Sequence, residues 1–177
     1  MSATKTTLKE LTWDLHTKAE KTLLMKSLLK NEMPTGLYCQ LVYTKFELYS
    51  IIEGKVQFRT PGLPRAQAAL NDLNDIGCSM PRCLPKFTSY MDYLRTLYPH
   101  QLWPHVYVHY LAPLYGGQII KRVIGHRLPT RISDFDDPES AKIEIRHHLT
   151  VDMAPEANKS FEMTIAYYDE LYESYHQ

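Results

Sequence analysis

Apolar residues recur at helical spacing along almost the whole chain. The first stretch shows this clearly, because its apolar residues stand three or four positions apart: Leu8, Leu11, Leu15, Ala19 and Leu23. Such a period of about 3.6 residues gives an α-helix one apolar face, whereas no stretch shows the alternation and hairpin turns of β-strands. No internal repeat is present. We therefore expect an all-α fold, a single compact helical bundle that residues 1–177 form as one domain.

Capping residues, proline and glycine divide this pattern into helices. We expect the first helix to start at a cap on Thr6 or Thr7 and to run to about Lys30. The second should begin near Thr35 and end at Gly54 or, as the turn sequence favours, at 60–64. Further helices are expected over about 65–75, 86–97, 103–125, 139–149 and 155–175. The segment 128–138 reads as a loop, and its aspartates suit the start of the next helix.

Charge and cysteine content narrow the functional classes. The 20 Lys and Arg residues balance the 20 Asp and Glu residues, so we expect neither a nucleic-acid partner nor an anionic membrane. No apolar run reaches membrane-spanning length, and the first residues lack an apolar signal segment. Cys39, Cys78 and Cys83 are too few for a zinc site and suggest no disulfide framework. We expect a soluble, cytoplasmic monomer with reduced thiols.

Two adjacent glycines interrupt a helical pattern in the segment 107–124. Gly116 and Gly117 each cost a helix about 1 kcal/mol relative to alanine, so their presence calls for an explanation. One interpretation is a backbone that bends or is approached closely by a flat ligand. From this segment alone, an ordinary kink or a close helix–helix contact is the simpler alternative.

Two further groups of side chains could bind a ligand. Thr12, His16 and Glu20 lie four residues apart on one side of the first helix. A carboxylate at this spacing can hold the histidine in one tautomer and leave its other nitrogen for a metal, although a surface pair is the simpler interpretation. Lys142 and Arg146, together with Lys9, would suit a ligand with two carboxylates. A solvated helix face is again the alternative.

Taken in their order along the chain, these features resemble the haem oxygenase family. The segment 8–20 is similar to the family's proximal helix, which implies that His16 ligates the iron and that Glu20 hydrogen-bonds His16. The segment 36–53 resembles the second helix. The segment 107–122 resembles the distal helix, whose glycines lie over the haem plane, and 134–146 resembles the start of a propionate-binding helix. The resemblance spans about residues 6–175 and is weak from 58 to 99.

The resemblance implies an activity and a set of binding residues. Haem would be both cofactor and substrate, opened with O2 to biliverdin, carbon monoxide and iron. Electrons would come from a ferredoxin or a flavoprotein reductase. Pairing of the propionates with cations would fix the rotation of the ring and so the meso carbon that is attacked. The residues expected to hold haem are Lys9, His16, Glu20, Tyr107, Gly116, Gly117, Lys142 and Arg146.

The distal segment departs from the family pattern. The family usually reads Tyr-Leu-Gly-Asp-Leu-Ser-Gly-Gly-Gln, whereas residues 110–118 read Tyr-Leu-Ala-Pro-Leu-Tyr-Gly-Gly-Gln. Pro113 replaces the aspartate that orders water on the distal side of the haem, and proline offers neither a carboxylate nor an N–H. Ala112 replaces a glycine, and Tyr115 replaces the serine.

A rebuilt polar network could take over the role of that aspartate. His109 stands where the family has an arginine, Thr164 where it has an asparagine, and Tyr49 is retained. With Tyr115 these side chains could order water again, so the expected catalytic set is Tyr49, His109, Gly116, Gly117 and Thr164. The alternatives are a haem carrier without ring-opening activity and a haem-free relative acting on small pyrimidine or quinone-type substrates. We expect the oxygenase activity, because the axial ligand, its partner and the propionate cations are all present.

Overall fold

The computed structural model describes residues 6–78 and 84–177, and within these ranges the chain is helical without strands. The α-helices are α1 (Leu8–Glu20), α2 (Leu23–Leu29), α3 (Thr35–Glu53), α4 (Ala66–Ile76), α5 (Pro85–Thr96), α6 (Trp103–Ile124), α7 (Pro138–His147) and α8 (Ala154–His176). Short 3-10 helices are η1 (Pro99–Leu102), η2 (Arg131–Ser133) and η3 (Val151–Met153). This confirms the all-α prediction.

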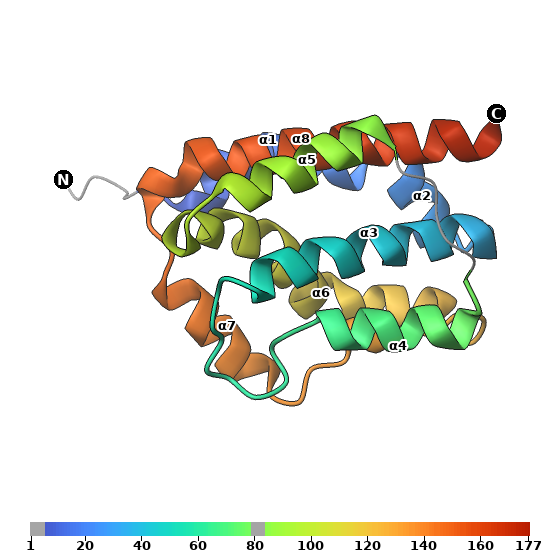
Figure 1. The fold of residues 1–177 in the computed structure, drawn as a ribbon, viewed down its shortest axis with the longest axis horizontal. Coiled ribbons are helices and arrows are strands. Elements are labelled where there is room, and N and C mark those ends of the chain that lie inside the picture. Colours follow the sequence, from blue (N-terminus) through green and yellow to red (C-terminus); the bar gives the residue numbers. More distant parts are fainter. Residues whose placement is uncertain (1–5, 79–83) are drawn as a thin grey trace.

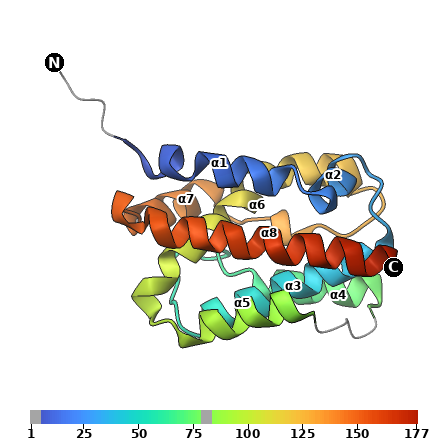
Figure 2. The same ribbon diagram turned by 90° about the horizontal axis from the view of Figure 1, so that it is seen from above.

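The long helix α8 organises the bundle. It packs against α1, α5 and α6, and Figure 2 shows α1 and α5 on its two sides. On the face that Figure 1 presents, α3 packs against α4 and α5. The opposite face is formed by α1, α2, α6 and α7. No helix in the described part of the chain is long and apolar enough to cross a membrane.

Most helix boundaries agree with the sequence pattern to within two residues. Thr7 caps α1 in a capping box with Glu10, as expected from its place before the apolar stripe. Further along the chain, the Asp137 carboxylate accepts a hydrogen bond from the Ser140 N–H at 3.0 Å and caps α7. These caps satisfy backbone donors that a helix end leaves without partners.

Two boundary predictions were wrong. The first helix does not run to Lys30, because the Thr22 hydroxyl accepts from the Met25 N–H and begins α2 as a separate helix. The second helix ends at Glu53, with Gly54 as its C-cap, rather than at 60–64. There the Lys55 ammonium donates to the carbonyl oxygens at the end of α5, at 2.5 Å for Arg95.

The expectation of three reduced thiols was also wrong. Cys39 of α3 and Cys78, which follows α4, are joined by a disulfide across a Cα–Cα distance of 5.9 Å. These cysteines are 39 residues apart, and the packing of α3 against α4 brings them together. Cys83 lies outside the described residues.

Candidate functional site

His16 is held on α1 by contacts on several sides. Its Nε2 lies 3.0 Å from Oε1 of Glu20, and its ring stacks on Phe161 of α8 at a centroid distance of 5.7 Å. Trp13 packs edge-on against the same ring. With Nε2 directed at Glu20, a neutral imidazole has on Nδ1 the lone pair that a metal ligand requires. The imidazole is therefore oriented but not enclosed, since 38% of its side chain is exposed.

A hydrogen bond ties the His16 helix to the glycine-containing helix α6. The hydroxyls of Thr12 and Tyr107 lie 3.0 Å apart, and Thr12 also donates to the carbonyl oxygen of Leu8. A small apolar cluster fills the space between α1, α6 and α8 below this bond, with Val108 and Ala157 among its members. Tyr107 thus fixes the spacing between the two helices that the family resemblance assigns to opposite faces of haem.

The two glycines of α6 have different surroundings. A Cβ on Gly117 would lie 2.7 Å from Cβ and Oγ of Ser133, so η2 can approach the helix only because this residue lacks a side chain. A Cβ on Gly116 would meet nothing within 4 Å. Gly117 is therefore explained by packing within the fold, whereas Gly116 leaves an open stretch of helix backbone.

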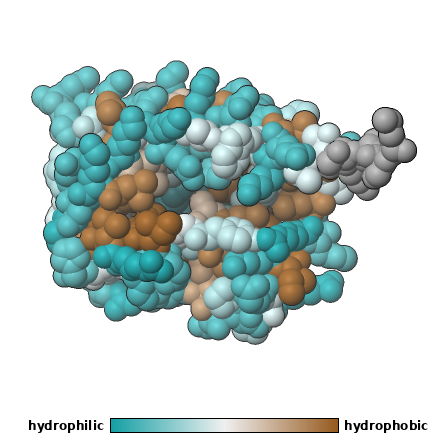
Figure 3. Space-filling view, turned by 180° about the vertical axis from the view of Figure 1, so that it is seen from behind, coloured by the Kyte–Doolittle hydropathy of each residue, from teal (hydrophilic) through white to brown (hydrophobic). Residues whose placement is uncertain are grey.

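The open backbone at Gly116 lies on a face with exposed apolar side chains. Tyr115 and Ile119 of α6 are among the most exposed large hydrophobic residues, as is Leu23 at the start of α2. Figure 3 shows that hydrophobic surface is also exposed on the side of the molecule opposite to that in Figure 1. Contiguous exposed apolar patches are typical of surfaces that bind a ligand or partner, which makes this face a candidate site.

Two cations of α7 converge on the residue before this glycine. The Lys142 ammonium lies 4.6 Å from the centroid of the Tyr115 ring, and the Arg146 guanidinium lies 5.4 Å from it. Lys142 also donates to Glu139 at 2.9 Å, and only 16% of its side chain is exposed. The third expected cation, Lys9, lies on α1 with its ammonium 5.7 Å from the Trp13 ring centroid.

The expected distal residues Tyr49 of α3, His109 of α6 and Thr164 of α8 meet in a buried polar network centred on His109. Its Nδ1 lies 3.3 Å from the Lys45 ammonium, and its Nε2 lies 3.3 Å from the Thr164 hydroxyl. The Tyr49 hydroxyl donates to the backbone carbonyl of His109 at 3.2 Å. Burial lowers the pKa of His109 well below its usual range, so the ring is neutral. Because an ammonium can only donate, Nδ1 is the acceptor and Nε2 carries the proton.

Sequence reasoning missed the residues that extend this network outward. The Tyr90 hydroxyl lies 3.1 Å from Nε2 of His109, 2.7 Å from the Ser160 hydroxyl and 2.7 Å from Nδ1 of His105. Nε2 of His105 lies 2.9 Å from Oε1 of Glu156, which is partly exposed. The four-residue spacing of His105 and His109 on one helix was the available signal. Through these contacts the network connects the buried His109 to solvent at Glu156.

The protonation states give this network a direction. The bond to His105 is the main reason that the Glu156 pKa is lowered, so Glu156 is an ionised acceptor and His105 donates from Nε2. Nδ1 of His105 then accepts from Tyr90, whose pKa burial raises above its ordinary value. Each group thus donates its hydrogen bond toward Glu156, and Tyr90 is the hydroxyl that both histidines share.

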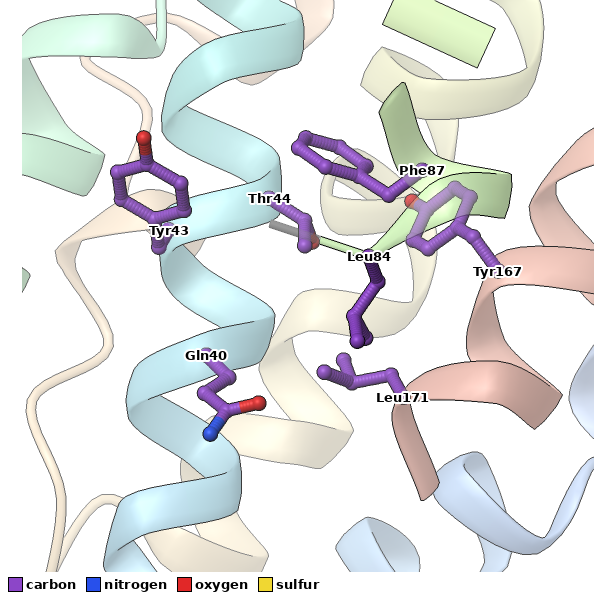
Figure 4. Close-up of a pocket in the computed structure, with 7 residues that line it drawn as sticks. All are labelled: Gln40, Tyr43, Thr44, Leu84, Phe87, Tyr167 and Leu171. Atoms are coloured by element: carbon purple, nitrogen blue, oxygen red, sulfur yellow. The ribbon is translucent and has the colours of Figure 1, made fainter. Parts of the chain in front are cut away.

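A small cavity lies on the side of the bundle formed by α3, α5 and α8. Its volume is about 10 Å³, and Figure 4 shows the side chains around it. Such a volume accommodates a water molecule at most. Among the described residues, no three His, Cys, Asp or Glu side chains gather as a metal site. Haem iron does not need such a cluster, because the porphyrin supplies four ligands itself.

Comparisons with known proteins find similar sequences over most of the chain. The Heme oxygenase family model matches residues 2–148. Heme oxygenase 1 of Synechocystis sp. is 28% identical over an alignment that covers 93% of this chain and 82% of that protein. Heme oxygenase 2 of Macaca fascicularis is 23% identical and aligns with 93% of this chain, which spans only 64% of that relative's length.

Solved structures show the same fold. Heme oxygenase-1 of Synechocystis sp. in complex with heme superposes with a TM-score of 0.80 at 26% identity, covering 93% of this chain and 90% of that one. The heme oxygenase of Leptospira interrogans gives a TM-score of 0.80 at 22% identity, covering 92% and 97%. On the strength of the family match over most of its length, the chain belongs to the haem oxygenase family.

Proposed function

We propose that this protein is a haem oxygenase that uses O2 and reducing equivalents to open haem to biliverdin, carbon monoxide and iron. The observation that carries the proposal is the pairing of His16 with Glu20 on a helix that Tyr107 joins to the open backbone at Gly116. An oriented imidazole, an apolar face and cations at its edge together match the chemistry of haem, which has an iron centre, a flat ring and two carboxylates.

Each group of residues has a distinct part in holding haem. His16 would ligate the iron, and Glu20 would fix the orientation of its imidazole. Lys142 and Arg146 on α7, with Lys9 on α1, pair with the propionates. Gly116 lets the ring approach the α6 backbone, while Gly117 and Tyr107 keep that backbone in place through Ser133 and Thr12. When bound, haem supplies the redox-active iron and the ring carbon that is oxidised.

The protein's remaining task is to control protons on the distal side. Pro113 lies one helical turn after His109 on α6 and has no polar group to hold water there. The neutral His109, anchored by Lys45 and Thr164, keeps polar hydrogens at that turn of the helix. Tyr49 holds the backbone carbonyl of His109, and Tyr90 connects its Nε2 to His105. We infer that this network replaces the missing carboxylate in ordering water.

A hemin titration followed by reduction under air tests the proposal. Hemin should bind with a Soret band of axial imidazole ligation, and ascorbate or a reductase should replace that band with the broad red absorption of a bilin. His16→Ala should lose the ligation, whereas the exposed His126→Ala serves as the control. A Soret band that persists under reductant and air would contradict ring opening, and an unchanged His16→Ala spectrum would contradict the ligand assignment.

The proposal also covers the electron donor, the oligomeric state and the cellular compartment. We propose a ferredoxin or a flavoprotein reductase as the electron donor and a monomeric protein in the cytoplasm. The basic residues Lys9, Lys142 and Arg146 near the haem edge would favour docking of an acidic ferredoxin, whose approach salt should weaken. Turnover with ferredoxin that does not fall as ionic strength rises would argue against this docking mode.

A further inference from the structure

Tyr115 occupies a position that the binding scheme above leaves without a role. It stands directly before Gly116 on α6, where the family usually has serine, and half of its side chain is exposed. Its aromatic face receives two cations from another helix, Lys142 at 4.6 Å and Arg146 at 5.4 Å. A serine could not make either contact. The ring therefore links the open backbone of α6 to the cations of α7.

We propose that Tyr115 is a positioning residue that holds Lys142 and Arg146 in place for the haem propionates and so fixes the rotation of the bound ring. The proposal rests on the function proposed above and adds a determinant of orientation to it. In this arrangement Tyr115 acts through the two cations and leaves the iron to His16.

The contacts leave both cations able to bind carboxylates. An ammonium has three N–H donors and a guanidinium has five, and a contact with an aromatic face does not consume all of them. Lys142 gives one of its donors to Glu139 at 2.9 Å, so its position is fixed from two directions. Donors remain on both side chains for two propionate groups, each of which can accept several hydrogen bonds.

The gain from Tyr115 comes from ordering the cations before haem arrives. Long basic side chains lose rotamer freedom when they bind a ligand, and that loss weakens binding. A ring that already confines Lys142 and Arg146 removes part of the loss. The Tyr115 ring also confines the two charges to one place on α7, so that one rotation of the haem pairs its propionates with them better than the other rotations. Without the Tyr115 ring, Lys142 and Arg146 could move to pair with the propionates in several rotations of the haem.

Binding of two porphyrins separates this role from ordinary packing. Tyr115→Leu keeps an apolar side chain but removes the aromatic face, and it should weaken hemin binding about fivefold, as expected for cation contacts at an exposed site. Hemin dimethyl ester lacks propionate charge, so its affinity should not change. Tyr115→Phe keeps the face and should restore most of the hemin affinity. The exposed Tyr98→Leu on η1's N-terminal side is the remote control.

Proton NMR of the ferric cyanide complex reads the orientation directly. Tyr115→Leu should add a second set of haem methyl resonances, whereas Tyr115→Phe should keep the single dominant set of the unaltered protein. Equal weakening for hemin and its dimethyl ester would mean that Tyr115 only packs against the ring, which overturns the proposal. Tighter hemin binding by Tyr115→Leu would overturn it too, because the ring would then compete with propionates for the cations.

Failure of the underlying function looks different. If the unaltered protein binds neither porphyrin through His16, the proposed function itself is wrong. If it binds hemin through His16 but Tyr115→Leu changes neither affinity nor resonances, only the role of Tyr115 is wrong.

Discussion

Nε2 of His105, whose side chain is fully buried, lies 2.9 Å from Oε1 of Glu156, a carboxylate that is 31% exposed. The other nitrogen of the same ring lies 2.7 Å from the Tyr90 hydroxyl. Both nitrogens of His105 therefore have partners, one an ionised acceptor and the other a hydroxyl donor. The pair connects solvent to the polar network behind α6, and its chemistry can be tested without any ligand.

The first prediction concerns stability in mild acid. Burial lowers the pKa of His105 in the folded protein, although Glu156 opposes the shift, while the unfolded chain keeps a pKa near about 6.5. The unfolded state therefore binds more protons below that pH, and the free energy of unfolding falls as pH drops from 7 toward the folded pKa. The limiting slope is about 1.4 kcal/mol per pH unit for each such histidine.

Variants isolate this contribution from those of other groups. His105 faces Tyr90 and Tyr93 of α5 and Glu156 and Lys159 of α8. Urea unfolding between pH 5 and 7 should give a shallower pH dependence for His105→Gln than for the unaltered protein, with the exposed His126→Gln as the matched control. Parallel curves for all three proteins would contradict a neutral His105.

The second prediction concerns the hydroxyl that the two histidines share. Tyr90→Phe leaves the ring in the core but removes the hydroxyl partner of His105 Nδ1, while His109 Nε2 and the Ser160 hydroxyl each lose one of their partners. Leaving buried polar atoms unpaired costs about 1–3 kcal/mol each in such sites, and we expect a loss of unfolding free energy in that range. Urea denaturation measures it, with the exposed Tyr98→Phe as control.

Tyr90→Phe should also slow ring opening more than it weakens hemin binding, because none of the residues that Tyr90 contacts in the network is among those expected to hold haem. A single-turnover experiment under air gives the rate, and a hemin titration gives the affinity. Equal losses in rate and affinity would indicate that Tyr90 supports only the fold around the site.

These predictions show where sequence reasoning succeeds and where it stops. His16 and Glu20 lie four residues apart on one helix, so their contact follows from helix geometry alone. Tyr90 and Ser160 are 70 residues apart, and only the packing of α5 against α8 brings their hydroxyls together. Spacing within a helix carries no information about such a contact.

Packing between helices also explains the other surprises. Cys39 and Cys78 meet because α3 packs on α4, and no spacing rule pairs them. Gly117 looked like its neighbour in the sequence, but Ser133 distinguishes the two glycines only after η2 has folded against α6. The break between α1 and α2 had a signal in the sequence, because threonine is a typical N-cap residue. Thr22 lies inside an apolar pattern that continues past it, and this pattern predicted one uninterrupted helix.

The third prediction concerns the thiols. A disulfide between Cys39 and Cys78 closes a loop of about 40 residues, for which chain-entropy arguments give a stabilisation of roughly 3–4 kcal/mol. The oxidised protein in denaturant should show two fewer reactive thiols than the reduced protein. Reduction should lower its melting temperature, and Cys39→Ser should be insensitive to the same reductant. Equal thiol counts before and after reduction would contradict the pairing.

The last prediction uses the two adjacent glycines as controls for each other. Gly117→Ala would place its Cβ 2.7 Å from Ser133, so it should destabilise the protein by about 1–3 kcal/mol without any ligand. Gly116→Ala meets open space and should stabilise the helix by up to about 1 kcal/mol. If haem lies against this turn of α6, the same methyl group must obstruct it. Gly116→Ala should then raise the melting temperature of the ligand-free protein and weaken hemin binding at the same time. A variant that is more stable and binds hemin with unchanged affinity would place the ring elsewhere on α6.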